Sequence, residues 1–188
     1  MSASKVSICS NALLLLGAQT ISSFDEDNDR ARLASNLWDN ALDAVQRSHP
    51  WNCCISRVAM APDATAPAFD WDYQYTLPSD WLKTLSVGYL GAEESYRIEG
   101  RKLLCNANPA YLRYIARNDN PATWDAMLIT AMELYMASQM AYPVTQSSSL
   151  ADSMYQKSAA HMKRARSVDG QDDTPEMMGD ERFLRARY

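Results

Sequence analysis

The most informative stretch for the fold of this chain is Asp70-Trp-Asp-Tyr-Gln-Tyr-Thr-Leu-Pro-Ser-Asp-Trp-Leu-Lys-Thr-Leu-Ser-Val87. Because proline fixes φ and both serine and aspartate favour turns, its Pro-Ser-Asp centre predicts a bend. After the bend, apolar and polar residues alternate as in a half-buried strand. We therefore interpret the stretch as a structural corner that leads into a β region, and its residues are Trp71, Tyr73, Tyr75, Leu77, Pro78, Asp80 and Trp81.

Composition limits the classes of protein to which the chain can belong. Its 188 residues are 47% hydrophobic and 22% charged, which suits one domain with a real core. The formal net charge of −5 argues against a protein that coats nucleic acid through a basic surface. The apolar runs are too short for a membrane span, and the first residues lack the features of a signal peptide. We expect synthesis in a cytoplasm and no membrane contact.

Helical patterns flank the middle of the chain. The first covers residues 4–17 and ends at Gly17, and the second covers residues 29–48 and ends at His49-Pro50. We expect Asn120-Pro121 to open a third helix, with asparagine as the N-cap, and Pro143 to end it. The fourth covers residues 148–168 before Asp169-Gly170, and its short link to the third predicts antiparallel packing.

Residues 51–117 differ from the flanking helices. Leu85, Val87 and Tyr89 alternate with small residues, which predicts a strand. A hairpin is expected to turn near Gly100, and residues 111–117 predict a further strand. The predicted fold class is mainly α: a bundle of about four helices in a single domain, 1–170, with a small inserted antiparallel β region at about 51–117 and an extended C-terminal arm, 171–188.

The last residues of the chain are strongly patterned by charge. Six acids and no base lie between Asp169 and Glu181, and a basic and aromatic segment follows. Arginine and aromatic residues are enriched at interface anchors, so a partner-docking role is one reading. A tail that folds back or stays mobile is the other. The candidate docking residues are Arg182, Phe183, Leu184, Arg185, Arg187 and Tyr188.

The sequence offers little that could support catalysis. Ser79, His49 and Asp80 could be combined on paper into a hydrolytic triad, but no Gly-x-Ser-x-Gly elbow frames the serine. The acidic clusters, such as residues 25–29, lie in polar loops rather than in the apolar pocket that a general acid needs. His161 is followed by basic residues late in a helix, where positive charge suits the helix dipole. We predict no catalytic residues, no metal site and no cofactor.

Sulfur-containing residues are best interpreted as packing residues. The four cysteines form no Cys-x-x-Cys pair, which favours small buried hydrophobes over a zinc or redox site. Four methionines recur along the third helical pattern, which favours adaptable core packing, with an oligomer contact as the alternative. These methionines are Met127, Met132, Met136 and Met140.

Several segments, in their order along the chain, resemble the head–tail connector adaptors of short-tailed bacteriophages, the tail tubular protein A family. They cover nearly the whole chain. The matching segments are Asn11-Ala-Leu-Leu-Leu-Leu-Gly17, Trp51 with Arg57 and Met60, Tyr75-Thr-Leu-Pro-Ser-Asp-Trp-Leu82, Leu112-Arg-Tyr-Ile-Ala-Arg117, the long alanine- and methionine-rich helix, and Leu184-Arg-Ala-Arg187.

The resemblance implies a virion structural protein in the neck of the tail, without enzymatic activity. Proteins of this family form twelve-subunit rings under the portal protein and carry the tail nozzle protein, of the tail tubular protein B type. Their C-terminal segment reaches into the portal, which would give residues 182–188 a use. Double-stranded DNA passes through the ring, and an acidic wall would let it slide without being held. The β segment would face the tail or a neighbouring subunit.

Two other functions stay open. A virion-associated peptidoglycan hydrolase would use exposed carboxylates. A DNA-packaging or regulatory protein would bind duplex DNA through a helical surface, and the acidic charge argues against it.

Overall fold

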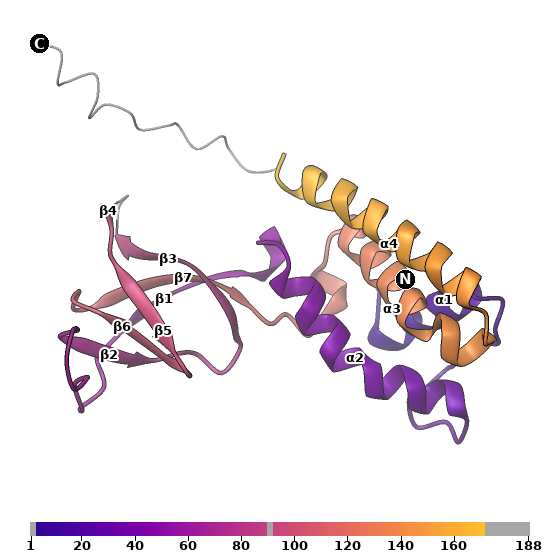
Figure 1. Ribbon diagram of the computed structural model, residues 1–188, viewed down its shortest axis with the longest axis horizontal. Coiled ribbons are helices and arrows are strands. Elements are labelled where there is room, and N and C mark those ends of the chain that lie inside the picture. Colours follow the sequence, from indigo (N-terminus) through magenta and orange to yellow (C-terminus); the bar gives the residue numbers. More distant parts are fainter. Residues whose placement is uncertain (1–2, 90–91, 172–188) are drawn as a thin grey trace, which may run out of the picture.

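The computed structural model describes residues 3–89 and 92–171, which form four α-helices, two short 3-10 helices and seven strands. The helices gather at one end of an elongated molecule and the strands at the other (Figure 1). We call these the helical part and the strand part. The helices are α1 (Lys5–Leu15), α2 (Asp29–Arg47), α3 (Ala126–Thr145) and α4 (Ser148–Asp169), with 3-10 turns at η1 (Asn52–Cys54) and η2 (Pro121–Thr123).

The strand part contains two antiparallel sheets. Its strands are β1 (Ile55–Met60), β2 (Tyr73–Thr76), β3 (Trp81–Tyr89), β4 (Ala92–Glu93), β5 (Tyr96–Glu99), β6 (Lys102–Cys105) and β7 (Ala110–Ala116). One sheet has the order β1-β7-β3-β4 and the other has the order β2-β6-β5. Side chains from both sheets meet in a single apolar cluster that includes Met60, Tyr75, Val87, Leu103 and Leu112.

The expected fold class, a mainly α bundle with a small β insertion, is wrong. The protein is mixed, because its seven strands build a strand part with an apolar cluster of its own beside the helical core. The sequence pattern predicts none of β1, β2 and β4, and it places the tyrosines of β2 in the wall of a corner. In Tyr73-Gln-Tyr-Thr76 the aromatic side chains alternate with polar ones, and Tyr75 pairs with Leu103 of β6. All of the expected C-terminal arm, 171–188, apart from residue 171 lies outside the described residues.

The first two helices begin and end as the sequence predicts. Ser4 caps α1 through a capping box with Ser7. At its end, Gly17 adopts φ 70°, and the N–H groups of Gly17 and Ala18 return to the carbonyls of Leu14 and Leu13 in a Schellman motif. Asn28 caps α2, whose apolar face is buried at Ala34, Trp38, Ala41, Leu42 and Val45.

Both predicted ends of the third helix are wrong. Asn120-Pro121 opens the 3-10 turn η2, and α3 begins only after Asp125, whose side chain caps Met127 N. Pro143 lies inside α3, which runs two residues further. A proline in the last turn removes one intrahelical hydrogen bond without ending the helix, and the left-handed Gln146, at φ 53°, ends it instead.

Packing of the helical part follows the predicted pattern. Helices α3 and α4 lie side by side and antiparallel, joined by Gln146 and Ser147 (Figure 1). Met132, Met136 and Met140 are fully buried, which confirms core packing, and Met127 packs at the edge of the core. Among the described residues, no helix combines the length and apolar character that a membrane crossing requires.

Candidate assembly surfaces and the junction between the two parts

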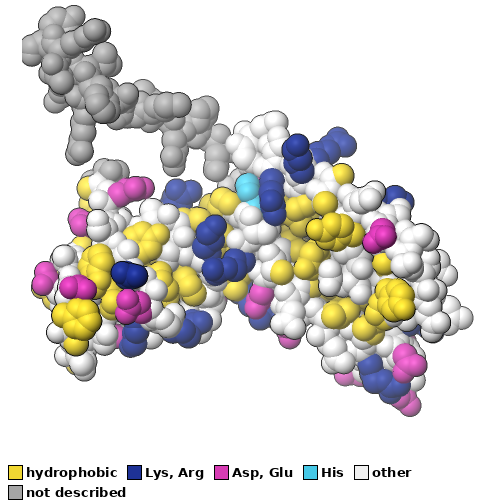
Figure 2. Space-filling view, in the orientation of Figure 1, with side chains coloured by type: hydrophobic (Ala, Val, Ile, Leu, Met, Phe, Trp, Pro, Cys, Tyr) yellow, Lys and Arg dark blue, Asp and Glu magenta, His cyan; other side chains and the backbone are white. Residues whose placement is uncertain are grey.

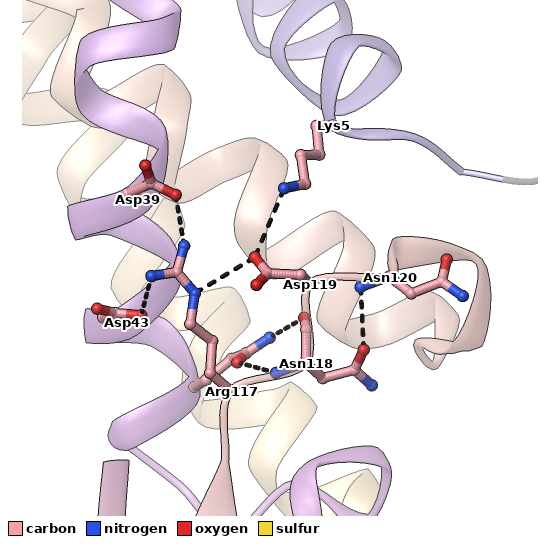
Figure 3. A network of polar contacts seen from close by, with 8 residues as sticks. Lys5, Asp39, Asp43, Arg117, Asn118, Asp119 and Asn120 are labelled. Carbon is pink, nitrogen blue, oxygen red and sulfur yellow. Dashed lines mark hydrogen bonds and ion pairs between the residues drawn. The ribbon is translucent and has the colours of Figure 1, made fainter. Parts of the chain in front are cut away.

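A polar network centred on Arg117 joins the strand part to the helical part (Figure 3). Arg117 directly follows β7, and its guanidinium pairs with Asp39 and Asp43 of α2, the latter at 3.4 Å. It also contacts Asp119 at 3.3 Å, and Lys5 of α1 reaches the same carboxylate at 3.5 Å. Partial burial would lower the pKa of Arg117, but the hydrogen bond with Asp39 and the surrounding carboxylates outweigh it and raise this pKa.

A second set of hydrogen bonds joins the two segments through which the chain passes between the helical part and the strand part. The buried Gln46 donates to Asn118 O at 2.8 Å and accepts from Asn118 N at 2.9 Å. The Asn118 side chain donates to Cys53 O at 2.9 Å. One asparagine therefore ties the segment that enters the strand part to the segment that leaves it.

The possible triad of Ser79, His49 and Asp80 is not assembled. His49 Nε2 lies 3.1 Å from Asp169 Oδ2 at the end of α4, and Asn52 N donates to the other oxygen of that carboxylate at 3.2 Å. The Asp80 carboxylate instead accepts from Tyr114 OH at 3.2 Å. His49 is therefore paired with Asp169 and Asp80 with Tyr114, and these contacts join separate elements of the fold.

Other candidate groups for chemistry have structural partners. His161 lies 3.1 Å from the carbonyl of Met127 on α3. Hydrogen bonds from Ser22 hold the pKa of Glu26 down at about 2, the opposite of what a general acid at neutral pH needs. The described residues contain no cluster of three or more metal-ligating side chains.

The predicted corner residues lie between the two sheets rather than at the entrance to the β region. The chain enters the strand part at β1, and the turn from Pro78 to Trp81 joins β2 to β3, closed by Trp81 N donating to Pro78 O at 3.1 Å. Tyr75 is fully buried and its hydroxyl donates to Ala107 O. Trp71 and Tyr73 precede the turn, and Leu77 is buried beside it.

Trp81 also connects the corner to the helical part. The guanidinium of Arg47, at the end of α2, lies 5.9 Å from its ring centroid and donates to Leu82 O. The indole N–H donates to Thr84 at 3.0 Å. The corner therefore contacts the end of α2, a role that the sequence did not reveal.

One face of the β1-β7-β3 sheet carries an aromatic and basic patch, which sequence reasoning missed. We call Arg57, Tyr89, Tyr111 and Arg113 the sheet-face patch; they line a shared surface hollow. Arg57 and Arg113 are direct cross-strand partners, and the rings of Tyr89 and Tyr111 lie 4.7 Å apart between centroids. The opposite face of this sheet covers the apolar cluster. The signal in the sequence was alternation in β7, where Tyr111 and Arg113 alternate with the buried Leu112 and Tyr114.

The helical part exposes a separate apolar surface. A groove between α2, α3 and α4 is lined by Val45, Tyr135, Tyr155 and Met162, among others, and Tyr155 is 65% exposed. We call it the helix groove. Hydrophobic side chains reach the visible surface over both parts of the molecule (Figure 2). The candidate docking residues 182–188 lie outside the described residues.

Neither a family model nor a curated protein matches this chain.

Proposed function

We propose that the protein is a virion structural protein, a head-to-tail connector adaptor. It docks as a twelve-subunit ring under the portal protein, carries the tail nozzle protein, and lines part of the channel through which double-stranded DNA passes without specific binding. The proposal rests on the ordered segments that resemble that family and on surfaces of the molecule itself.

The observation that carries the proposal is the pair of unlike exposed surfaces on the two parts. A closed ring with head-to-tail contacts needs two different complementary patches on each subunit. An adaptor additionally needs ends of different chemistry for its two neighbours. The sheet-face patch is rich in tyrosine and arginine, the residues that dominate interface energetics, whereas the helix groove is mainly apolar.

The junction supports the same role. An adaptor must hold its two ends in a fixed relation while both are loaded, and the Arg117 network and the Gln46–Asn118 hydrogen bonds join them. Arg117 is charged throughout the physiological range, so these contacts persist across it.

The test mixes the purified full chain with the portal protein of the same phage and images the product by electron microscopy. We expect a twelve-fold ring on the portal. A chain truncated after Gly179 is the matched variant, and it should fold as the full chain does, by circular dichroism, but fail to dock.

Other results would overturn the proposal. Failure of the folded full chain to associate with the portal would contradict it directly, and equal docking by the truncated chain would remove the role of residues 182–188. Clearing of cell-wall suspensions that a single Asp or Glu substitution abolishes would favour the hydrolase. A salt-sensitive gel shift with plain duplex DNA would favour the DNA-binding protein.

A further inference from the structure

Two adjacent cysteines lie where the chain passes from the helical part into the strand part. Cys53 and Cys54 belong to the 3-10 turn η1, and their Sγ atoms are 3.8 Å apart. Cys54 is buried, as are Cys9 and Cys105, whereas Cys53 is partly exposed. Cys53 and the buried Cys54 both line a surface hollow of about 460 Å³, together with Arg117, Asn118 and Asn120. Of the four thiols, only Cys53 therefore combines exposure with space for a ligand.

The surroundings of Cys53 favour its thiolate. Its pKa is lowered, first by the hydrogen bond with Cys54 and also by the backbone N–H of Asp125 at the start of α3. A helix N-terminus carries partial positive charge that stabilises a thiolate. Burial and the carboxylate of Asp169 oppose this effect. Arg117 and Asp119, of opposite charge, also line the hollow.

The other three thiols are held in the protonated form. The hydrogen bond with Cys53 and burial raise the pKa of Cys54 far above its usual range, so this side chain acts as the S–H donor of the pair. Burial raises the pKa of Cys9 to about 12 and also raises that of Cys105. Because the thiolate is the nucleophile, reactivity concentrates at Cys53.

We propose that Cys53 is a site of reversible S-thiolation by low-molecular-weight disulfides of the glutathione type, with Cys54 as a positioning residue. The Cys53 thiolate attacks one sulfur of the disulfide, a new S–S bond forms, and the other half leaves as a thiolate that takes a proton from solvent. The exchange consumes one disulfide and releases one thiol, and a free thiol reverses it. The hollow lies within the range of roughly 300 to 1,000 Å³ typical of small-molecule sites.

The adduct is expected to persist rather than resolve into a Cys53–Cys54 disulfide. Neighbouring Cα atoms across a trans peptide are about 3.8 Å apart. That separation is shorter than the roughly 4.4 to 6.8 Å that unstrained disulfides span. Attack by Cys54 would also need its thiolate, which is scarce because its pKa is raised. One mixed disulfide per chain is the predicted end state.

The test incubates the reduced full chain with glutathione disulfide and follows it by intact-mass measurement and peptide mapping. We expect one glutathione adduct, on Cys53, removed by added thiol and absent in Cys53→Ser. Cys54→Ala removes the S–H donor and should slow adduct formation roughly three- to tenfold, because less thiolate is present. Cys54→Ser keeps a hydroxyl donor and should retain most of the rate. Circular dichroism checks that each variant is folded.

Three results would overturn the proposal. The first is an adduct that forms equally fast on Cys9, Cys54 or Cys105, or that forms only in denaturant. The second is the loss of two thiols without added mass, which would mean that the adjacent pair closes on itself. The third is an undiminished rate in the folded Cys54→Ala variant, which would remove Cys54 from its assigned role. None of these outcomes depends on whether the chain docks on a portal.

Discussion

At the scale of single residues, the junction depends on one guanidinium. Arg117 draws together Asp39 and Asp43 from one side and Asp119 from another, and only 26% of its side chain is exposed. Partly shielded pairs that share a partner contribute more than isolated surface pairs do. Removing the arginine also leaves these carboxylates facing one another.

Arg117→Met should therefore lower the free energy of unfolding by about 1 to 2 kcal/mol, because three ion pairs are lost together. Urea titration followed by tryptophan fluorescence measures this change. Arg97→Met is the matched control: among the described residues Arg97 forms an ion pair with Glu99 alone, at 3.5 Å, and is 70% exposed. It should change stability by less than about 0.5 kcal/mol. Equal effects of the two substitutions would show that the network does not stabilise the junction.

The stability of the protein should depend on pH through Glu26, in the loop before α2. Hydrogen bonds from Ser22, Asn28 and Ser23 lower its pKa from 4.5 to about 2, so the folded state holds the carboxylate ionised more firmly than the unfolded state does. This contribution is complete above pH 4.5 and is lost as the pH falls toward 2. Glu26→Gln should therefore lower the melting temperature at pH 7 and weaken its decline between those two pH values. An unchanged decline would contradict this assignment.

At the scale of elements, the β3–β4 pairing depends on a close backbone approach at Gly88. Its φ is 146°, and a Cβ there would lie 1.9 Å from Ala92 O in the partner strand. Gly88→Ala should therefore separate β4 from β3 and lower stability by about 1 to 3 kcal/mol. Thermal melts and amide exchange of the strand measure both effects.

Gly100 provides the matched control for this substitution. Its φ is 58°, in the turn between β5 and β6, but a Cβ at this position would meet nothing within 4 Å. Gly100→Ala incurs only the conformational strain, about 1 kcal/mol. If both variants lost the same stability, steric conflict with Ala92 would not be the cause at Gly88.

Local chemistry explains which elements the sequence could reveal. Helix α2 has an asparagine cap and a continuous apolar stripe, so both its existence and its bounds could be predicted. The start of α3 could not, because Asn120-Pro121 and Asp125 are both acceptable helix starts and packing decides between them. Strand β2 could not be predicted from the local sequence, because turn residues follow it directly. Its pairing with β6 joins residues far apart in the sequence.

The surfaces were harder to predict than the elements. The sheet-face patch combines side chains from three strands, so no single segment displays it. The contact between Arg47 and Trp81 likewise joins α2 to β3 across the junction. By contrast, the sequence alone shows that no Gly-x-Ser-x-Gly elbow surrounds Ser79. In the structure, His49 contacts Asp169.

At the scale of the whole molecule, apolar side chains of the strand part reach the helical core: Leu82 and Leu85 of β3 pack against it, and Ile115 is the fully buried one. Ile115 belongs to β7 but is fully buried in the core cluster of the helical part. Ile115→Ala should cost about 2 to 4 kcal/mol and loosen the coupling between the parts. Circular dichroism reporting on helices and hydrogen exchange of the strands should then give separate unfolding transitions.

Leu103→Ala is the control for this coupling. Leu103 is equally buried but lies within the cluster of the strand part. Its loss should destabilise by a similar amount without the same effect on the helices. Coincident transitions in the Ile115→Ala variant would show that the other contacts across the junction, the polar network and the packing of Leu82 and Leu85, keep the two parts cooperative.

The two chain crossings at Cys53 and Asn118 have an evolutionary consequence. The chain enters and leaves the strand part at neighbouring positions, since β1 and β7 are paired from Ile55 with Ile115 onward. When the two ends of an inserted segment lie side by side, another segment can replace it, because the new segment has to connect only at those two ends. A lineage could thus replace one end of the molecule to meet a new neighbour while the helical end stays unchanged.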